Sequence, residues 1–296
     1  MKVYAPSYYG KFHCIGGACR HTCCVGWEVG IDGDTLCRMA VVGGAFGERL
    51  CASVDFEEGV FRLLPGDRCP MLREDGLCDL ILEMGEDGLP MICDEHPRYT
   101  HTLSHRTEVG LGMSCEEACR LLLASPLPLS LVPVGEDGEE ERSMGEEEAA
   151  VLALREECFA ILGREELSLA EKEDAILRAA GGRVPDAEGI LALLRPLERM
   201  DTAWDVILAR TPSDPAASCA HGEQMLFYFL HRHLTDAPTP EEAAARVSFA
   251  VLSRRAVSML SQGDEGEVLR AYSAEVEYSE ENVEELLSAL RLGLSS

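Results

Sequence analysis

Apolar residues recur every three or four positions through most of the second half of the chain. This spacing places apolar side chains along one face of an α-helix. Ser168 with Glu171 three residues later, and Ser279 with Asn282, are typical of helix N-termini, and the first pair has the form of a capping box. The pattern predicts an α-helical array, with helices over residues 146–162, 168–180, 186–200, 223–234, 240–261 and 280–292.

Short apolar segments alternate with Gly, Pro and Asp turn signals over the first 125 residues. Asp32-Gly33 and Pro65-Gly66 are two of these signals. We expect only brief helices here, at 34–40 and 115–124, as in domains where a metal replaces part of the hydrophobic core. The predicted fold class is therefore mainly α, with an irregular, cysteine-rich, metal-binding N-terminal half followed by an α-helical array.

A change of composition separates the two halves. Pro126-Leu127-Pro128 is followed by the acidic run 136–141, and such a run repels itself and favours an exposed connection. We place a cysteine-rich metal or iron–sulfur domain at 1–125, an acidic linker at 126–145 and an α-helical domain at 146–296.

The net charge is −27, from 53 acidic and 26 basic residues. A surface this acidic disfavours nucleic acid, whose phosphates are bound by Lys and Arg, and it is compatible with a lysine-bearing protein partner or with a well-solvated surface. The apolar stretches are too short to cross a bilayer. Thirteen cysteines without an export signal predict a cytoplasmic location, where clustered thiols bind metal more often than they form disulfides.

Eight cysteines are the main candidates for chemistry. Four lie within eleven residues, and thiolates packed this densely repel one another unless a cation neutralises them. The eight cysteines suit either one four-ligand site with accessory thiols or two four-ligand sites. The bound group is either zinc or an iron–sulfur cluster. We expect at least four sulfurs to share a common centre. Cys37, Cys51 and Cys119 are expected to be core or surface thiols. The candidate ligands are Cys14, Cys19, Cys23, Cys24, Cys69, Cys78, Cys93 and Cys115.

A polar stretch after Cys93 combines groups that suit either catalysis or local structure. His96 titrates near neutrality in its ordinary state, so a role beside the thiols and an extended turn before proline are both open. The weak catalytic candidates are His96, Arg98, Tyr99 and Glu108, with an Arg98–Glu108 ion pair as the structural alternative.

Two other pairs of histidines have simpler expectations. His101 and His105 are expected at the surface. His231 and His233 are two residues apart, so they point away from each other on a helix whose aromatic face belongs to the core.

Motifs in consistent order over about residues 4–125 resemble the flagellin lysine-N-methylase family and the wider group of cysteine-cluster proteins thought to chelate zinc or iron. The first set is Tyr4-x-Pro6, Phe12-x-Cys14-Ile15-Gly16, Cys19, Thr22-Cys23-Cys24-x-Gly26-Trp27 and Ile31-Asp32. The second set is Cys69-Pro70-Met71-Leu72, Gly76-Leu77-Cys78, Gly85-Glu86, Cys93-x-x-His96-Pro97-Arg98, Glu108-x-Gly110-Leu111 and Ser114-Cys115.

The resemblance implies transfer of a methyl group from S-adenosylmethionine to lysine side chains of flagellin. It also implies a [4Fe–4S] cluster held by the eight candidate cysteines, with zinc as the alternative. On this interpretation His96 takes up the ammonium proton, Glu108 orients the lysine and Arg98 binds the carboxylate of S-adenosylmethionine. The competing hypothesis is a non-catalytic zinc- or iron-binding module whose helical half binds a partner.

Overall fold

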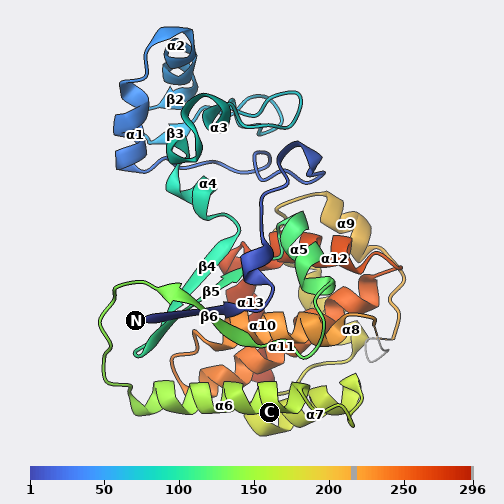
Figure 1. Cartoon of the computed structure of the whole chain (residues 1–296). Helices are drawn as coiled ribbons and strands as arrows, with labels where there is room; N and C mark the ends of the chain where they lie inside the picture. Colours follow the sequence, from blue (N-terminus) through green and yellow to red (C-terminus); the bar gives the residue numbers. More distant parts are fainter. Residues whose placement is uncertain (215–218, 295–296) are drawn as a thin grey trace. The chain divides into compact units, whose positions relative to one another are not determined.

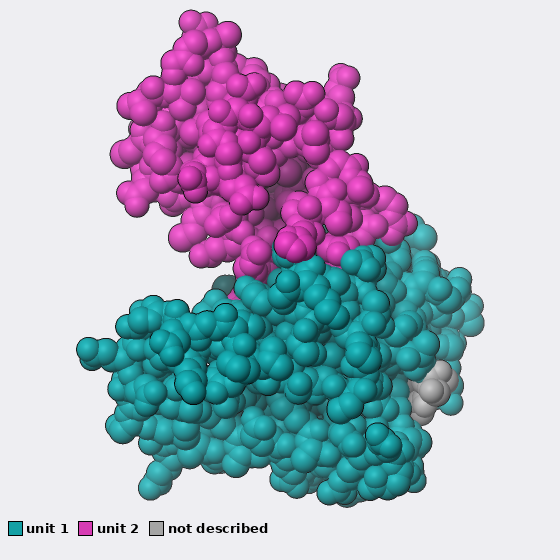
Figure 2. Space-filling view, viewed as in Figure 1, with its two compact units in different colours: residues 1–12, 100–114, 118–296 teal, residues 13–99, 115–117 magenta. Residues whose placement is uncertain are grey.

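A computed structural model describes residues 1–214 and 219–294 of the chain. Contacts divide it into two compact units, which Figure 2 shows in different colours. Unit 1 contains residues 1–12, 100–114 and 118–296, and unit 2 contains residues 13–99 and 115–117. This grouping differs from the domains expected at 1–125, 126–145 and 146–296. Those domains were expected to fold independently, and that expectation stays a prediction. Residues 295–296 lie outside the described residues.

A four-stranded mixed sheet in the order β4-β5-β1-β6 belongs to unit 1, except for the first two residues of β4, which belong to unit 2 (Figure 1). The central strand β1 runs parallel to β5 and antiparallel to β6, so Tyr4 lies between Glu108 and Pro133. Pro133 lacks an amide proton, and β6 tolerates it because β6 is an edge strand. The strands are β1 (Lys2–Pro6), β4 (Arg98–Thr102), β5 (Arg106–Leu111) and β6 (Leu131–Glu136).

The six helices predicted for the second half all form. One of them ends early, at Leu194, because Pro196 lacks the amide proton that a helix needs and disfavours helical geometry in the residue before it. Ser168 and Glu171 make the predicted capping box, and Ser279 accepts the amide proton of Asn282. These helices are α6 (Glu146–Leu162), α7 (Leu169–Ala180), α8 (Ala187–Leu194), α10 (Gly222–Leu234), α11 (Pro240–Leu260) and α13 (Glu280–Leu294).

Helices α10 and α11 form the centre of unit 1, and α6, α7 and α13 pack around them (Figure 1). Most residues of α10 and α11 are buried, including the aromatic residues of α10, which confirms that its aromatic face belongs to the core. A helix that is apolar on all sides needs neighbours on all sides. Further helical segments are α5 (Glu116–Leu123), α9 (Ala203–Leu208), α12 (Glu265–Tyr272), the one-turn η1 (Tyr9–Lys11) and the π-helix η4 (Ser273–Glu277).

Unit 2 has a small hydrophobic core of its own. Met39, Leu50, Phe61, Met71 and Leu80 are each at most 2% exposed and pack in one cluster. The elements around it are η2 (Gly16–Ala18), α1 (Gly33–Ala40), α2 (Gly44–Ser53), β2 (Val54–Asp55), β3 (Val60–Phe61), α3 (Asp79–Met84), η3 (Glu86–Gly88) and α4 (Met91–Glu95).

The predicted fold class is wrong. About half of the chain is helical, but a mixed sheet accompanies the helices, and the cysteine-rich part contains several short helices around an apolar core. Among the described residues, no three His, Cys, Asp or Glu side chains are arranged to hold a metal ion. The sheet escaped prediction because its strands are short and their partners lie far apart in the sequence. None of the described helices combines the length and apolar composition needed to cross a bilayer.

We expect Gly76→Ala to destabilise the protein more than Gly138→Ala. Both glycines have a positive φ, which costs an L-residue about 1–2 kcal/mol. A Cβ on Gly76 would also lie 2.9 Å from the Cα of Gly17, whereas a Cβ on Gly138 meets nothing within 4 Å. Urea unfolding of both variants measures the difference, and equal losses would contradict the close approach of Gly17 and Gly76.

Candidate functional site

All eight candidate cysteines lie in unit 2, whereas Cys158 and Cys219 lie in unit 1. Two short antiparallel segments bring the first cysteine run beside Cys69. Val25 pairs with Arg68, and the amide of Cys69 donates to the carbonyl of Cys24 at 2.8 Å. Backbone geometry therefore joins thiols that are far apart in the sequence.

Four thiols pack against the core of unit 2, and we call them the inner thiol group: Cys24, Cys69, Cys78 and Cys93. Burial raises the pKa of Cys69 to about 11 and that of Cys93 to about 12, and neighbouring thiols add to both shifts. The hydrogen bond between the Cys23 and Cys24 thiols lowers the pKa of Cys24 and raises that of Cys23. The inner thiols therefore influence one another electrostatically.

Cys19 lies beside the segment that carries Cys115. The Cys19 sulfur is 3.8 Å from a Glu116 oxygen, and Glu116 also accepts from the backbone amide of Arg20 at 2.9 Å and from its Nε at 2.8 Å. Burial raises the pKa of Cys19. Cys119, in unit 1, is buried as expected and donates to the carbonyl of Met113, while Cys37 and Cys51 are exposed.

Thiol donors suit zinc or an iron–sulfur cluster. In the part of the chain that the structure describes, no three potential ligands share a common centre. The expectation that at least four sulfurs do so is wrong in this geometry, and we route no reaction step through a metal. The assignment of the eight cysteines as ligands stays a prediction.

His96, Arg98 and Tyr99 lie at the end of unit 2, just after α4 and Cys93. Burial lowers the pKa of His96 to about 4, and the charge of Arg98 adds to the effect, so the imidazole is neutral near pH 7. Arg98 is exposed and donates from Nη1 to the carbonyl of Asp94 at 2.9 Å.

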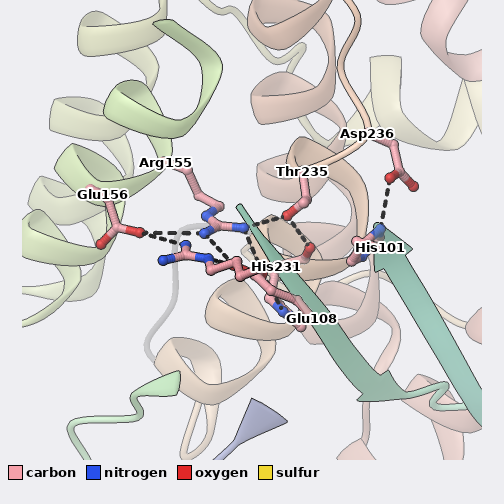
Figure 3. A network of polar contacts seen from close by, with 8 residues as sticks. His101, Glu108, Arg155, Glu156, His231, Thr235 and Asp236 are labelled. Carbon is pink, nitrogen blue, oxygen red and sulfur yellow. Dashed lines mark hydrogen bonds and ion pairs between the residues drawn. The ribbon is translucent and has the colours of Figure 1, made fainter. Parts of the chain in front are cut away.

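Glu108 belongs to unit 1 and is fully buried in a polar network (Figure 3). Arg155 donates two hydrogen bonds to its carboxylate, both at 2.8 Å, and Arg106 donates a third at 2.7 Å. The Nε2 atom of His231, on α10, lies 3.1 Å from a carboxylate oxygen of Glu108. Glu108 thus forms its ion pairs with Arg106 and Arg155, and these two cations compensate for burying its negative charge.

The network sets the charge states of its members. Burial by itself raises the pKa of Glu108, but the hydrogen bonds from His231 and Arg155 outweigh it and hold the pKa well below its ordinary value. Burial lowers the pKa of His231 to about 4, against the opposing effect of Glu108. The stable state is therefore a carboxylate beside a guanidinium and a neutral imidazole.

The network extends to the end of α10. Arg155 donates to the hydroxyl of Thr235 at 2.7 Å, and Thr235 donates to the carbonyl of His231 at 2.8 Å. His101 contacts Asp236 at 2.7 Å and meets the His231 ring edge-on (Figure 3). The expectation that His101 lies at the surface is wrong, since it is 4% exposed. No local pattern in the sequence distinguishes Arg155, because a charged residue in a periodic helix usually faces solvent.

His233 contacts a second buried carboxylate, Glu277 of η4, at 2.6 Å. Tyr228 donates to the same carboxylate at 2.9 Å. His231 and His233 thus reach different partners, as their spacing on a helix predicts.

Each unit has a shallow cavity. The one in unit 1 has a volume of about 560 Å³ and lies between the start of α6 and the Thr235–Pro238 segment. The one in unit 2 has a volume of about 750 Å³ and a largely acidic lining that includes Asp32. Asp32 caps α1 and accepts from the amides of Thr35 and Met91, and these hydrogen bonds lower its pKa to about 2.

Three proteins of known name are similar to part of this chain. The chain is 28% identical over 142 residues to a protein of Salmonella typhimurium named "Lysine-N-methylase", and 28% identical over 139 residues to one of the same name from Salmonella choleraesuis. The predicted resemblance to the flagellin lysine-N-methylase family is confirmed. A protein of Salmonella muenchen named "Flagellar biosynthetic protein FliU" is 27% identical over 139 residues.

Each match covers 44% of this chain. It spans 35% of each lysine-N-methylase and 82% of the flagellar biosynthetic protein. No family model matches the chain, and no solved structure matches it. The similarity to the lysine-N-methylases therefore concerns a part of each protein.

We expect Arg155→Met to destabilise unit 1 by about 3–5 kcal/mol, because it leaves the buried Glu108 carboxylate without its two-bonded partner. Arg142→Met, at an exposed position, serves as the control, with an expected change within about 0.5 kcal/mol. Adding Glu108→Gln to Arg155→Met removes the unpaired charge and restores part of the loss. Urea unfolding measures all three, and a small loss in Arg155→Met would contradict the assigned importance of this ion pair.

The stability of unit 1 is expected to fall as the pH decreases from 6.5 towards 4. In that range the unfolded His231, with its ordinary pKa of 6.5, binds a proton that the folded imidazole, with a pKa of about 4, does not. From His231 alone this lowers the free energy of unfolding by about 2 kcal/mol between pH 7 and pH 4.5. Below pH 4.5 the depressed pKa of Glu108 acts in the same direction. Unfolding curves of the wild type and His231→Gln test this, and an equal slope in both would assign the effect to other groups.

Proposed function

We propose that the protein is a protein-lysine N-methyltransferase that takes its methyl group from S-adenosylmethionine and acts on a flagellin-like substrate. The observation that carries the proposal is the similarity to proteins named lysine-N-methylase. The name of the Salmonella muenchen relative connects this similarity with the flagellum.

The charge of the chain supports a lysine-bearing partner. A net charge of −27 attracts cationic side chains and speeds their approach at low ionic strength. The acidic cavity of unit 2 adds to this negative electrostatic potential. It belongs to the same unit as His96 and Arg98.

Methyl transfer requires a neutral lysine amine, although the free ammonium has a pKa of about 10.4. The amine nitrogen forms a bond to the methyl carbon while the carbon–sulfur bond of the sulfonium breaks, its electron pair stays on sulfur, and a proton leaves the nitrogen. A base with a pKa near 4, such as His96, accepts that proton only with difficulty. His96 therefore suits hydrogen bonding to the substrate better than its deprotonation.

The other proposed cofactor is a [4Fe–4S] cluster, with zinc as the alternative, and it rests on the resemblance alone. Anaerobic purification followed by iron, sulfide and zinc analysis tests it directly. We assign no part of the methyl transfer to this group. The cytoplasmic location is likewise a proposal from the sequence.

The decisive experiment offers the anaerobically purified protein isotope-labelled S-adenosylmethionine and purified flagellin. We expect label on lysine side chains, located by peptide mass spectrometry. Flagellin with acetylated lysines is the control and should remain unlabelled. Absence of label on native flagellin and on other lysine-rich proteins would contradict the enzymatic proposal and favour a non-catalytic binding module.

We expect Arg98→Ala to raise the KM for S-adenosylmethionine by roughly tenfold, the size expected for losing a charged hydrogen bond to a carboxylate. His96→Ala should lower kcat by a comparable factor. The control is Arg73→Ala, which removes another exposed arginine of unit 2, one that pairs with Asp75. Unchanged kinetics in both test variants would remove the His96–Arg98 patch from the reaction.

A further inference from the structure

Cys24 and Cys69 occupy opposing positions on two antiparallel segments of unit 2. Val25 pairs with Arg68, and the flanking hydrogen bonds run from the Gly26 amide to the Asp67 carbonyl at 3.0 Å and from the Cys69 amide to the Cys24 carbonyl at 2.8 Å. In this pairing the residue before Val25 faces the residue after Arg68. Directly opposed residues place their side chains on one face, with Cβ atoms about 4.5–5.5 Å apart.

Their surroundings agree with this placement. Cys24 and Cys69 both pack against the hydrophobic core of unit 2. Cα atoms of a hydrogen-bonded antiparallel pair lie about 5.5 Å apart. Disulfides span Cα separations of about 4.4–6.8 Å, which includes this pair, and Cβ separations of about 3.5–4.5 Å, so a bond between these two sulfurs requires the two segments to bring the Cβ atoms slightly closer together.

Access differs between the two thiols. Cys24 is partly exposed, whereas Cys69 is only 6% exposed. An oxidant from solvent therefore reaches Cys24 first, and Cys69 is positioned to react with the product from the opposing strand. No disulfide joins the cysteines in the described part of the chain.

We propose that Cys24 and Cys69 are a modification site that forms a reversible cross-strand disulfide on reaction with a hydroperoxide. The Cys24 sulfur attacks the terminal peroxide oxygen, the O–O bond breaks, and Cys24 becomes a sulfenic acid while an alcohol, or water from hydrogen peroxide, leaves. The Cys69 sulfur then attacks the Cys24 sulfur, the S–O bond breaks, and water leaves with the Cys69 proton. The two sulfurs are oxidised, and one peroxide is reduced.

The disulfide converts two members of the inner thiol group, Cys24 and Cys69, into a form that is no longer a thiol. Any ligand that requires Cys24 and Cys69 as thiolates is excluded while the bond exists, and a dithiol reductant restores both. This inference concerns the thiols themselves and does not depend on methyltransferase activity.

The test treats the full-length, reduced, metal-free protein with hydrogen peroxide, blocks remaining thiols with N-ethylmaleimide under denaturing conditions, and maps the tryptic peptides. We expect residues 21–38 joined to residues 69–73, with N-ethylmaleimide on the two remaining cysteines and two hydrogen atoms lost at the new bond, and separated again by dithiothreitol. Because residues 21–38 also contain Cys23 and Cys37, fragmentation of the joined peptides identifies the bonded sulfur.

Two serine variants make a matched pair. Cys24→Ser should abolish the joined peptide, whereas Cys23→Ser, which changes the adjacent thiol, should retain it. The wild-type map decides the question even where a variant folds poorly. A joined peptide bonded through Cys23 or Cys37, a link from Cys24 to Cys78 or Cys93 instead, or oxidation without any Cys24–Cys69 link would overturn the proposal.

Discussion

The buried ion pair between Glu108 and Arg155 connects the sheet of unit 1 to its helices. Removing both charges from water is costly, and the cost is offset because two hydrogen bonds from Arg155 and one from Arg106 satisfy the carboxylate. His231 and Thr235 complete the arrangement from α10. Strand β5, helix α6 and helix α10 must therefore come together for the network to form, which couples the sheet to the helical array.

Unit 2 is organised differently. Its core is small and apolar, and its loops are positioned by short antiparallel pairings and by close approaches such as that of Gly17 to Gly76. The thiols lie on this framework, four of them against the core and others beside Glu116. Backbone hydrogen bonds, such as the one from the Cys69 amide to the Cys24 carbonyl, help to hold these thiols in position.

The division into units separates residues that are neighbours in sequence. His96 and Arg98 belong to unit 2, whereas Glu108 is buried in unit 1 and bound by two arginines. A single catalytic patch of His96, Arg98, Tyr99 and Glu108 would require Glu108 to be available to a substrate, and its burial gives it a structural role. The proposed methyl transfer therefore rests on the similarity to lysine-N-methylases and on unit 2 rather than on Glu108.

The sequence by itself determined six helices of unit 1, though not α9, α12 or η4, because a helix is specified by apolar spacing and local capping such as Ser168 with Glu171. It also identified the eight cysteines and the resemblance that they carry. Only the tertiary structure decided the sheet, the core of unit 2 and the partners of Glu108, His101 and Cys24. Strand pairing and buried ion pairs join residues far apart in the chain, as with the 47 positions between Glu108 and Arg155, and no local pattern records such contacts. A buried arginine and an exposed one look alike in sequence, because the difference lies in what packs against them.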